Sequence, residues 1–185
     1  MIDTTCSLEE EVKNFSLPIA CRMYPSAVGV DLPFKHRQYF CEKLDDFDYF
    51  LFTENDILVT QESVDFIVEK SSLIEHNEII GFCRYEEKEG VKYFTDYDVG
   101  SRLTLHHAWR QSGQVFFTPD SMYSGCYLLS KSQLKRAILS GGYLVSPHVR
   151  LYGILEQGSS DIYTQCGFKP KLFANRSCIS PSSPE

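Results

Sequence analysis

Two carboxylates and an amide stand together at Glu54-Asn55-Asp56. Their side-chain oxygens are hard ligands, suited to Mg²⁺ or Mn²⁺ that keeps several waters and also contacts a substrate diphosphate. The three residues directly follow an apolar and aromatic run, residues 47–52. In open α/β sheets, ligands bind just outside the carboxyl ends of the parallel strands. This position favours a metal and diphosphate site, with an ordinary acidic turn as the alternative.

Histidines and basic residues supply the other polar groups of interest. Lys35-His36-Arg37 form a basic cluster near a predicted helix start, which would suit a diphosphate; a solvated charge cluster is the alternative. His106-His107 are adjacent, and neighbours in a strand face opposite sides, so we expect them to be structural or to face an acceptor. His148 is predicted to lie in an exposed loop, with an acceptor contact or a third metal ligand as alternatives.

The elements that must position these residues alternate between strand and helix in the first half of the chain. Residues 17–24 are predicted to form the first strand and residues 25–33 a loop. Apolar residues at helical spacing predict a helix over residues 34–47. The nearly continuous apolar run 47–52 is typical of a strand buried on both faces of a parallel sheet. Thr60 then caps a further helix, which gives an α/β order.

The second half has a more antiparallel character. Ser130 and Gln133 form a predicted capping box that begins a helix. Short apolar segments bounded by turn residues predict strands, and two short helices follow near the C-terminus. The predicted strands cover residues 78–85, 91–97, 114–117 and 124–129, and the predicted helices cover residues 149–157 and 161–166.

Composition limits the class of protein and its partners. The chain has 185 residues, of which 43% are hydrophobic and 23% charged, so it is not a disordered chain, and we expect one domain over residues 1–185 with a disordered tail at 179–185. The formal net charge of −7 argues against nucleic acid or an anionic membrane surface as the main partner. No apolar run approaches the roughly 20 residues of a membrane span, so none is expected.

Cellular location is left open by the sequence. The N-terminal residues 1–13 lack the basic start and apolar stretch of a signal peptide. Two glycosylation sequons, at Asn14 and Asn175, would fit a secretory or Golgi lumen if the chain is a fragment of a longer protein. Such tripeptides are common by chance, so they carry little weight.

The run of residues 32–59 resembles the GT-A class of nucleotide-sugar glycosyltransferases. In that class a helix with basic residues precedes a buried strand, and the strand delivers an acidic DxD-like motif to the metal and diphosphate. The resemblance implies that Asp56 is a metal ligand, that Glu54 positions the nucleotide ribose or completes the metal shell, and that Lys35-His36-Arg37 help to bind the donor. Asn55 stands where the similar branch has its first Asp, which keeps an oxygen ligand but removes one charge.

Two later stretches share the resemblance. In residues 122–129, Ser124 and Gly125 would present a small turn to the donor sugar, with a tight turn into a buried strand as the alternative that Gly125 by itself favours. Residues 155–168 resemble the acceptor side of inverting enzymes, where a carboxylate takes the proton of the acceptor hydroxyl. Asp161 is the first choice for this base and Glu156 the second, with a helix N-cap as the alternative for Asp161.

Together these stretches imply a GT-A-like, Rossmann-like mixed sheet flanked by helices, with the first βα unit missing or shortened. The implied function is metal-dependent transfer of a sugar from a nucleotide-diphosphate donor to a hydroxyl of a glycan, protein or small molecule, with Mn²⁺ or Mg²⁺. One alternative is a catalytically impaired or truncated relative that acts as a binding or scaffold module. Another is a metal-dependent phosphohydrolase that uses the same acidic strand end.

Overall fold

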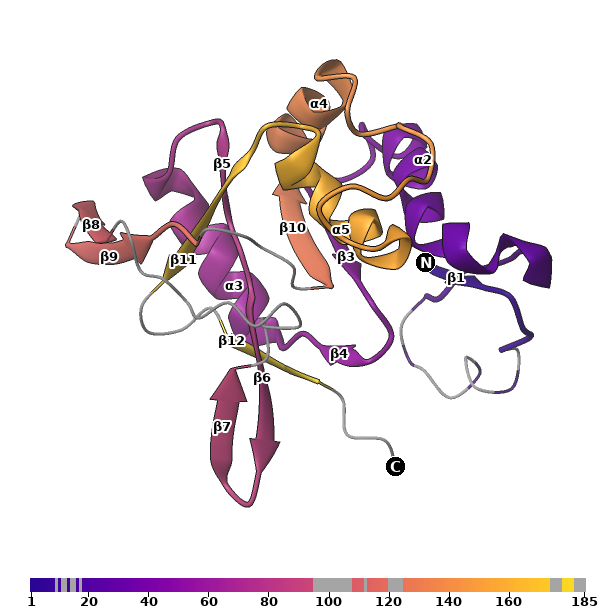
Figure 1. The fold of residues 1–185 in the computed structure, drawn as a ribbon, viewed down its shortest axis with the longest axis horizontal. Coiled ribbons are helices and arrows are strands. Elements are labelled where there is room, and N and C mark those ends of the chain that lie inside the picture. The colour runs from indigo at the N-terminus through magenta and orange to yellow at the C-terminus, as the bar shows by residue number, and fades with distance from the viewer. Residues whose placement is uncertain are drawn as a thin grey trace.

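The computed structural model describes residues 1–8, 10, 13, 16, 18–94, 108–111, 113–119, 125–173 and 178–181. Ser124 and the pair His106-His107 lie outside these residues, as does the end of the strand predicted to reach residue 97. The described part has a mixed α/β architecture, with α-helices beside several small sheets (Figure 1). The α-helices are α2 (Lys35–Glu42), α3 (Gln61–Lys70), α4 (Lys131–Leu139) and α5 (Ile154–Thr164), and the 3₁₀ helices are η1 (Ser26–Phe34) and η2 (Ser71–Leu73).

The described strands form four small sheets. They are β1 (Ile2–Thr4), β2 (Cys21–Met23), β3 (Tyr49–Thr53), β4 (Ile57–Leu58), β5 (Glu78–Ile80), β6 (Cys83–Lys88), β7 (Val91–Phe94), β8 (Ala108–Gln111), β9 (Gln114–Phe117), β10 (Cys126–Ser130), β11 (Lys169–Phe173) and β12 (Cys178–Pro181). β1 pairs with β2 in parallel and β3 with β10 antiparallel. The orders β5-β11-β9-β8 and β4-β12-β6-β7 each combine parallel and antiparallel pairs, and the β6–β7 hairpin projects from the body (Figure 1).

β3 differs from the strand that the sequence predicted. It pairs antiparallel with β10 and is not buried on both faces, since Tyr49 is 39% and Leu51 36% exposed. Phe50 and Phe52 alternate with these residues and face inward. The prediction of a parallel strand with two covered faces is therefore wrong, because aromatic residues on a half-exposed strand give the same apolar run as a fully buried one.

β10 is covered on both faces and contributes to two apolar cores, as β5 also does. Tyr127 and Leu129 belong to the first core, which also contains Phe40, Phe50, Ile79, Leu134, Ala137, Tyr143, Ile162, Cys166 and Phe168. Cys126 and Leu128 belong to the second core, which also contains Ile57, Ile67, Ile80, Phe82 and Phe116. The two-residue period of a strand thus lets one short segment hold the α2–α4–α5 side and the α3 side of the molecule together.

The helix caps follow the sequence closely. Thr60 accepts a hydrogen bond from the backbone N–H of Ser63 at 3.2 Å and begins α3. Ser130 and Gln133 form the reciprocal capping box of α4, as predicted. No helix in the described ranges is long and apolar enough to cross a membrane.

Three segments differ from the sequence-based expectation. Residues 26–34 form η1, two 3₁₀ segments that meet at a kink at Gly29, and not a loop. The two short helices expected near the C-terminus are one continuous helix, α5. Residues 178–181 form β12, paired with β4 and β6, in place of the start of a disordered tail; residues 182–185 lie outside the described part.

Gly158 allows α5 to pack directly on η1. A β-carbon at residue 158 would lie 3.0 Å from the carbonyl oxygen of Pro33 and 3.1 Å from its carbonyl carbon. Backbone atoms cannot swing away as a side-chain tip can, so a side chain here would push the two helices apart. Gly158, which lies between the two helices that the sequence predicted, is thus a packing contact within one helix.

We expect Gly158→Ala to destabilise the protein. Alanine normally stabilises a helix interior by about 1 kcal/mol relative to glycine, but overpacking against Pro33 should reverse the sign and cost about 1–3 kcal/mol. Urea unfolding followed by circular dichroism measures the change. A stabilised Gly158→Ala variant would contradict this packing.

Candidate functional site

The acidic residues Glu54-Asn55-Asp56 form a tight turn between β3 and β4, named here the acidic turn. The backbone N–H of Ile57 donates to the carbonyl oxygen of Glu54 at 3.3 Å, which closes the turn. Asn55 and Asp56 are exposed and Glu54 is half-buried. The turn therefore presents one carboxylate and one amide to solvent, and holds the second carboxylate against the protein.

Gly125 lies against the acidic turn. The backbone N–H of Glu54 donates to the carbonyl oxygen of Gly125 at 2.9 Å, continuing the β3–β10 pairing. Gly125 has a φ of +62°, and a β-carbon at this position would lie 2.9 Å from Oε2 of Glu54. Only glycine combines this backbone conformation with so close a carboxylate. Two residues predicted for the donor site, from distant stretches of sequence, are thus neighbours.

Arg37 lies inside the protein and not at a solvent-facing diphosphate site. Its side chain is only 3% exposed, and its guanidinium donates to the carbonyl oxygens of Tyr143 at 3.1 Å, Gln157 at 2.9 Å and Gly158 at 3.0 Å. It also forms an ion pair with Oδ2 of Asp161 at 3.0 Å. The ring of Phe34 covers the guanidinium at 4.4 Å. All of these partners enclose the charge within protein.

Asp161, the first-choice catalytic base, is the buried counter-ion of Arg37. Its side chain is 0% exposed. Oδ2 accepts from Arg37, while Oδ1 accepts from Gln157 at 2.6 Å and from Thr164 at 3.0 Å. Nε2 of His148 lies 3.4 Å from the same Oδ1. The residue sits inside α5 and is not a helix N-cap, and its two oxygens are fully engaged by protein groups.

His36 begins a second buried polar chain beside Arg37. Its Nε2 is hydrogen-bonded to the hydroxyl of Tyr127, which is bonded in turn to the hydroxyl of Tyr143 at 2.9 Å. Its ring stacks on Phe52 with centroids 4.0 Å apart. Burial, and secondarily the charge of Arg37, lower the pKa of His36 well below its usual value, so the ring is neutral.

The remaining predicted residues lie nearer the surface. Lys35 is half-buried, and its ammonium group lies 5.9 Å from the centre of the Tyr24 ring. Glu156 is half-buried in the first turn of α5, where its carboxylate folds back over Gly153. His148 is partly exposed, and its Nδ1 lies 3.0 Å from the carbonyl oxygen of Ser146. Glu156 is thus the more accessible of the two carboxylates considered as a base.

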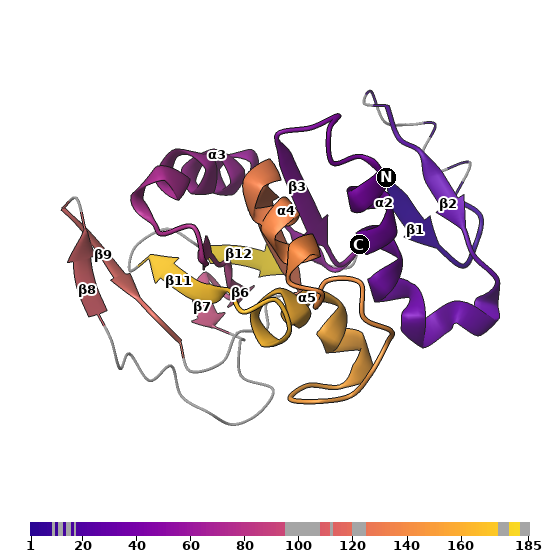
Figure 2. The same ribbon diagram turned by 90° about the horizontal axis from the view of Figure 1, so that it is seen from above.

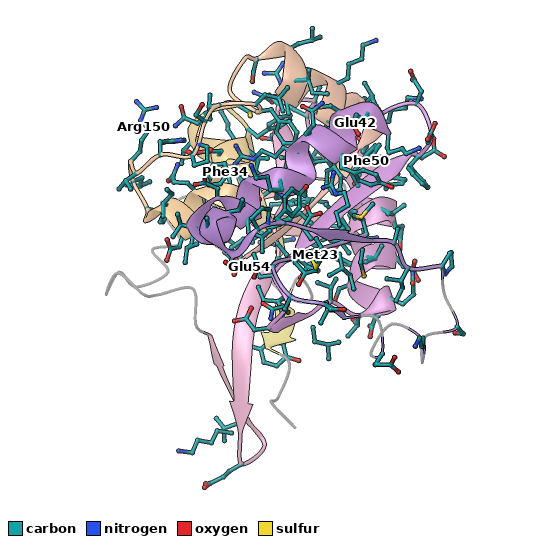
Figure 3. The ribbon with its side chains drawn as sticks, turned by 90° about the vertical axis from the view of Figure 1, so that its right-hand side faces the viewer. Met23, Phe34, Glu42, Phe50, Glu54 and Arg150 are labelled. Atoms are coloured by element: carbon teal, nitrogen blue, oxygen red, sulfur yellow. The ribbon has the colours of Figure 1, made fainter. Side chains whose placement is uncertain are left out.

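Most of the predicted residues form two groups. Glu54, Asn55, Asp56 and Gly125 surround the acidic turn, whereas Arg37 of α2 pairs with Asp161 of α5 inside the protein and His36 is buried beside Arg37. Figure 3 shows Glu54 well separated from Phe34, which covers Arg37, and from Arg150 in the segment before α5. Within the described residues, no group of three or more His, Cys, Asp or Glu side chains is placed to hold a metal ion by itself.

Sequence reasoning missed the neutral members of the buried network. Gln157 bonds Asp161 from one helical turn away, a spacing that the continuous helix would have revealed. Tyr127 and Tyr143 lie in different elements, and no local signal links them to His36. The chain has no match among protein-family models, curated proteins or solved structures.

We expect Asp161→Asn to be strongly destabilising, because it leaves the buried charge of Arg37 without a counter-ion. The loss should be about 3–5 kcal/mol in urea unfolding. Replacing both partners, as Arg37→Met with Asp161→Leu, should recover much of that loss.

Asp45→Asn is the control for this experiment. It breaks the solvent-exposed pair of Asp45 with Lys131, 3.0 Å apart, and should leave the urea midpoint unchanged. Equal effects of Asp161→Asn and Asp45→Asn would show that the buried pair does not hold the fold.

His36 should make stability depend on pH below neutrality. The unfolded chain takes up a proton near the ordinary pKa of 6.5, whereas the folded chain, whose pKa is lowered, does not. The unfolded state then binds more protons, so stability is complete above that value and is lost as pH falls, by up to about 2 kcal/mol between pH 7 and 5.

The pH effect is measured by urea unfolding at several pH values for wild type and His36→Gln. The variant keeps a polar group near Tyr127 but does not titrate, so its stability should vary less over this range. Identical pH profiles for the two proteins would rule out His36 as the source.

Proposed function

We propose that the chain binds a nucleotide-diphosphate sugar together with Mn²⁺ or Mg²⁺ at the acidic turn, and transfers the sugar to a hydroxyl acceptor. The main support is that Glu54 and Gly125 meet at the end of the β3–β10 pair. These residues come from two separate stretches that resemble the donor side of GT-A enzymes. Their contact is what a shared donor site requires.

The side chains of the acidic turn suit a hard cation. The exposed oxygens of Asp56 and Asn55 can serve as ligands, with Glu54 beside them. Mg²⁺ and similar ions commonly use one or two carboxylates and take their other ligands from water and substrate phosphates. When bound, such an ion would neutralise the charge of the departing diphosphate.

The proposed base is Glu156 and not Asp161. A base must reach the acceptor hydroxyl, and the buried Asp161 is engaged by Arg37, Gln157 and Thr164. Glu156 is half-buried at the beginning of α5 and has the exposure that the role needs. Asp161 would then position α5, through Arg37, without taking part in the reaction.

The second candidate function is a binding module that holds the donor without transferring its sugar. This function is favoured because Asp161, the first choice of base, is held in a buried ion pair with Arg37. Incubation with UDP- and GDP-sugars and Mn²⁺ separates the possibilities. Transfer to an acceptor supports the enzyme, bound nucleotide without transfer supports the module, and release of free phosphate supports the phosphohydrolase.

We expect micromolar binding of UDP or GDP that requires both Mn²⁺ and Asp56. Calorimetric titration with and without Mn²⁺ should show that Asp56→Ala loses the binding, because its carboxylate links the ion to the protein. Asp65→Ala is the matched control: Asp65 is an exposed carboxylate on α3, bonded to Gln61 at 2.8 Å, and its loss removes the same charge.

The outcomes of this titration are clear-cut. Binding that survives in Asp65→Ala and fails in Asp56→Ala places the nucleotide at the acidic turn. Equal weakening in both variants would reduce the effect to net charge, and no binding of either nucleotide by wild type would end the donor-site proposal.

A further inference from the structure

A cavity of about 550 Å³ lies between α4, η2 and the segment that follows α5. Its size falls in the range of about 300–1,000 Å³ that is typical of small-molecule sites. It lies at the far end of the β3–β10 pair from the acidic turn, because Ser130, which lines it, pairs with Tyr49, whereas the turn follows Thr53, which pairs with Cys126. It is thus separate from the proposed donor site.

Among the described residues that line this cavity, Arg136 is the one arginine or lysine. Its guanidinium lies over the ring of Phe168, 5.5 Å from the centroid, which fixes its position. The Nε atom is buried and has no hydrogen-bond partner among the described residues. Because Nε is enclosed, the Nη groups are the donors that remain for an acceptor on a ligand.

Arg136 has no counter-ion among the described residues. Glu75 lines the same cavity, yet no ion pair joins it to Arg136. Arg37 differs because its Nη groups have four protein acceptors, although its Nε is likewise buried and without a partner. The Nη groups of an arginine are therefore closed off by protein at one site and left open at the other.

Hydroxyl and imidazole groups complete the polar lining. Ser132 and Ser140 lie on α4 and at its end, and His76 faces them from the segment after η2. Leu139 and Ile74 supply apolar surface beside them. Such a mixture suits a small polar molecule whose anionic end is held by a guanidinium fork and whose other polar groups meet hydroxyls.

We propose that this cavity binds a small molecule carrying an oxyanion, either a phosphate or a carboxylate, with Arg136 as its anchor. The bonds would be made by the Nη–H groups of the guanidinium to oxygens of the anion. Ser132, Ser140 and His76 would contact the rest of the molecule. The inference does not depend on the acidic turn or on sugar transfer.

The test is a titration of ¹⁵N-labelled protein with sodium phosphate and with sodium acetate at constant ionic strength, followed by the arginine Nε–H resonances. The Arg136 signal, assigned by its loss in Arg136→Gln, should shift saturably with at least one anion. The anion that gives the tighter binding identifies whether phosphate or carboxylate is preferred.

Lys135→Gln is the matched control, because Lys135 is the exposed neighbour of Arg136 on α4 and does not line the cavity. We expect Arg136→Gln to weaken anion binding by about tenfold or more, as loss of a charged hydrogen bond implies, and Lys135→Gln to leave it unchanged. Equal weakening in both variants would show non-specific attraction and overturn the proposal.

An Arg136 signal in wild type that shifts with neither anion would also overturn it, and this readout does not depend on how any variant folds. Nucleotide binding at the acidic turn should be the same in Arg136→Gln as in wild type. Loss of anion binding with intact nucleotide binding, or the reverse, therefore tells the failure of one proposal from the failure of the other.

Discussion

The buried guanidinium of Arg37 is the constraint on which the arrangement of α2, η1 and α5 depends. A charge removed from water is tolerated only where a counter-ion and hydrogen-bond acceptors surround it. Here Asp161 and three backbone carbonyls do so. Two of the carbonyls belong to α5, so the helix must approach closely, and Gly158 permits this by leaving room for Pro33. Packing and electrostatics therefore fix α5 in the same place. Figure 2 shows this helix beside the segment that holds η1 and α2.

β10 connects these packed helices to the acidic turn through its pairing with β3. Tyr127 faces the first core, where it contacts His36 and Tyr143, and Leu128 faces the second core. Because β3 is paired only with β10 in the described part of the chain, the end of β3 is positioned by that pairing and by Phe50 and Phe52 on its inner face. A rigid strand end with exposed oxygens is a better ligand platform than a free loop.

Local signals in the sequence predicted local structure well. The caps at Thr60 and Ser130 and the α/β order are confirmed, because each depends on residues within one turn of each other. The prediction that β3 is buried on both faces is wrong, because an apolar run of residues does not reveal what covers each face of a strand. α5 was predicted as two short helices but is continuous across residues 158–160, where Gly158 packs against Pro33.

In the candidate site, too, local features were predictable from the sequence and long-range contacts were not. The acidic turn was recognisable from adjacent residues, but its contact with Gly125 depends on strand register, which the sequence alone does not specify. Arg37 and Asp161 are 124 positions apart, so no local pattern reveals their pairing. Each was expected to face a substrate, whereas in the structure they face each other. Burial decided their role, and burial is a property of the whole fold.

The burial of His36 and Arg37 limits the ways in which an acidic chain could hold a diphosphate. With a formal net charge of −7, it needs a local positive charge to attract that ligand. His36 is neutral and Arg37 is neutralised by Asp161, so neither of these residues supplies it. In the proposed function the positive charge must therefore come mainly from a divalent ion at Asp56, supplemented by Lys35 if the donor reaches the start of α2. Dependence on a metal is then a consequence of the buried ion pair: the residues that would have served as fixed cations were used to hold the fold.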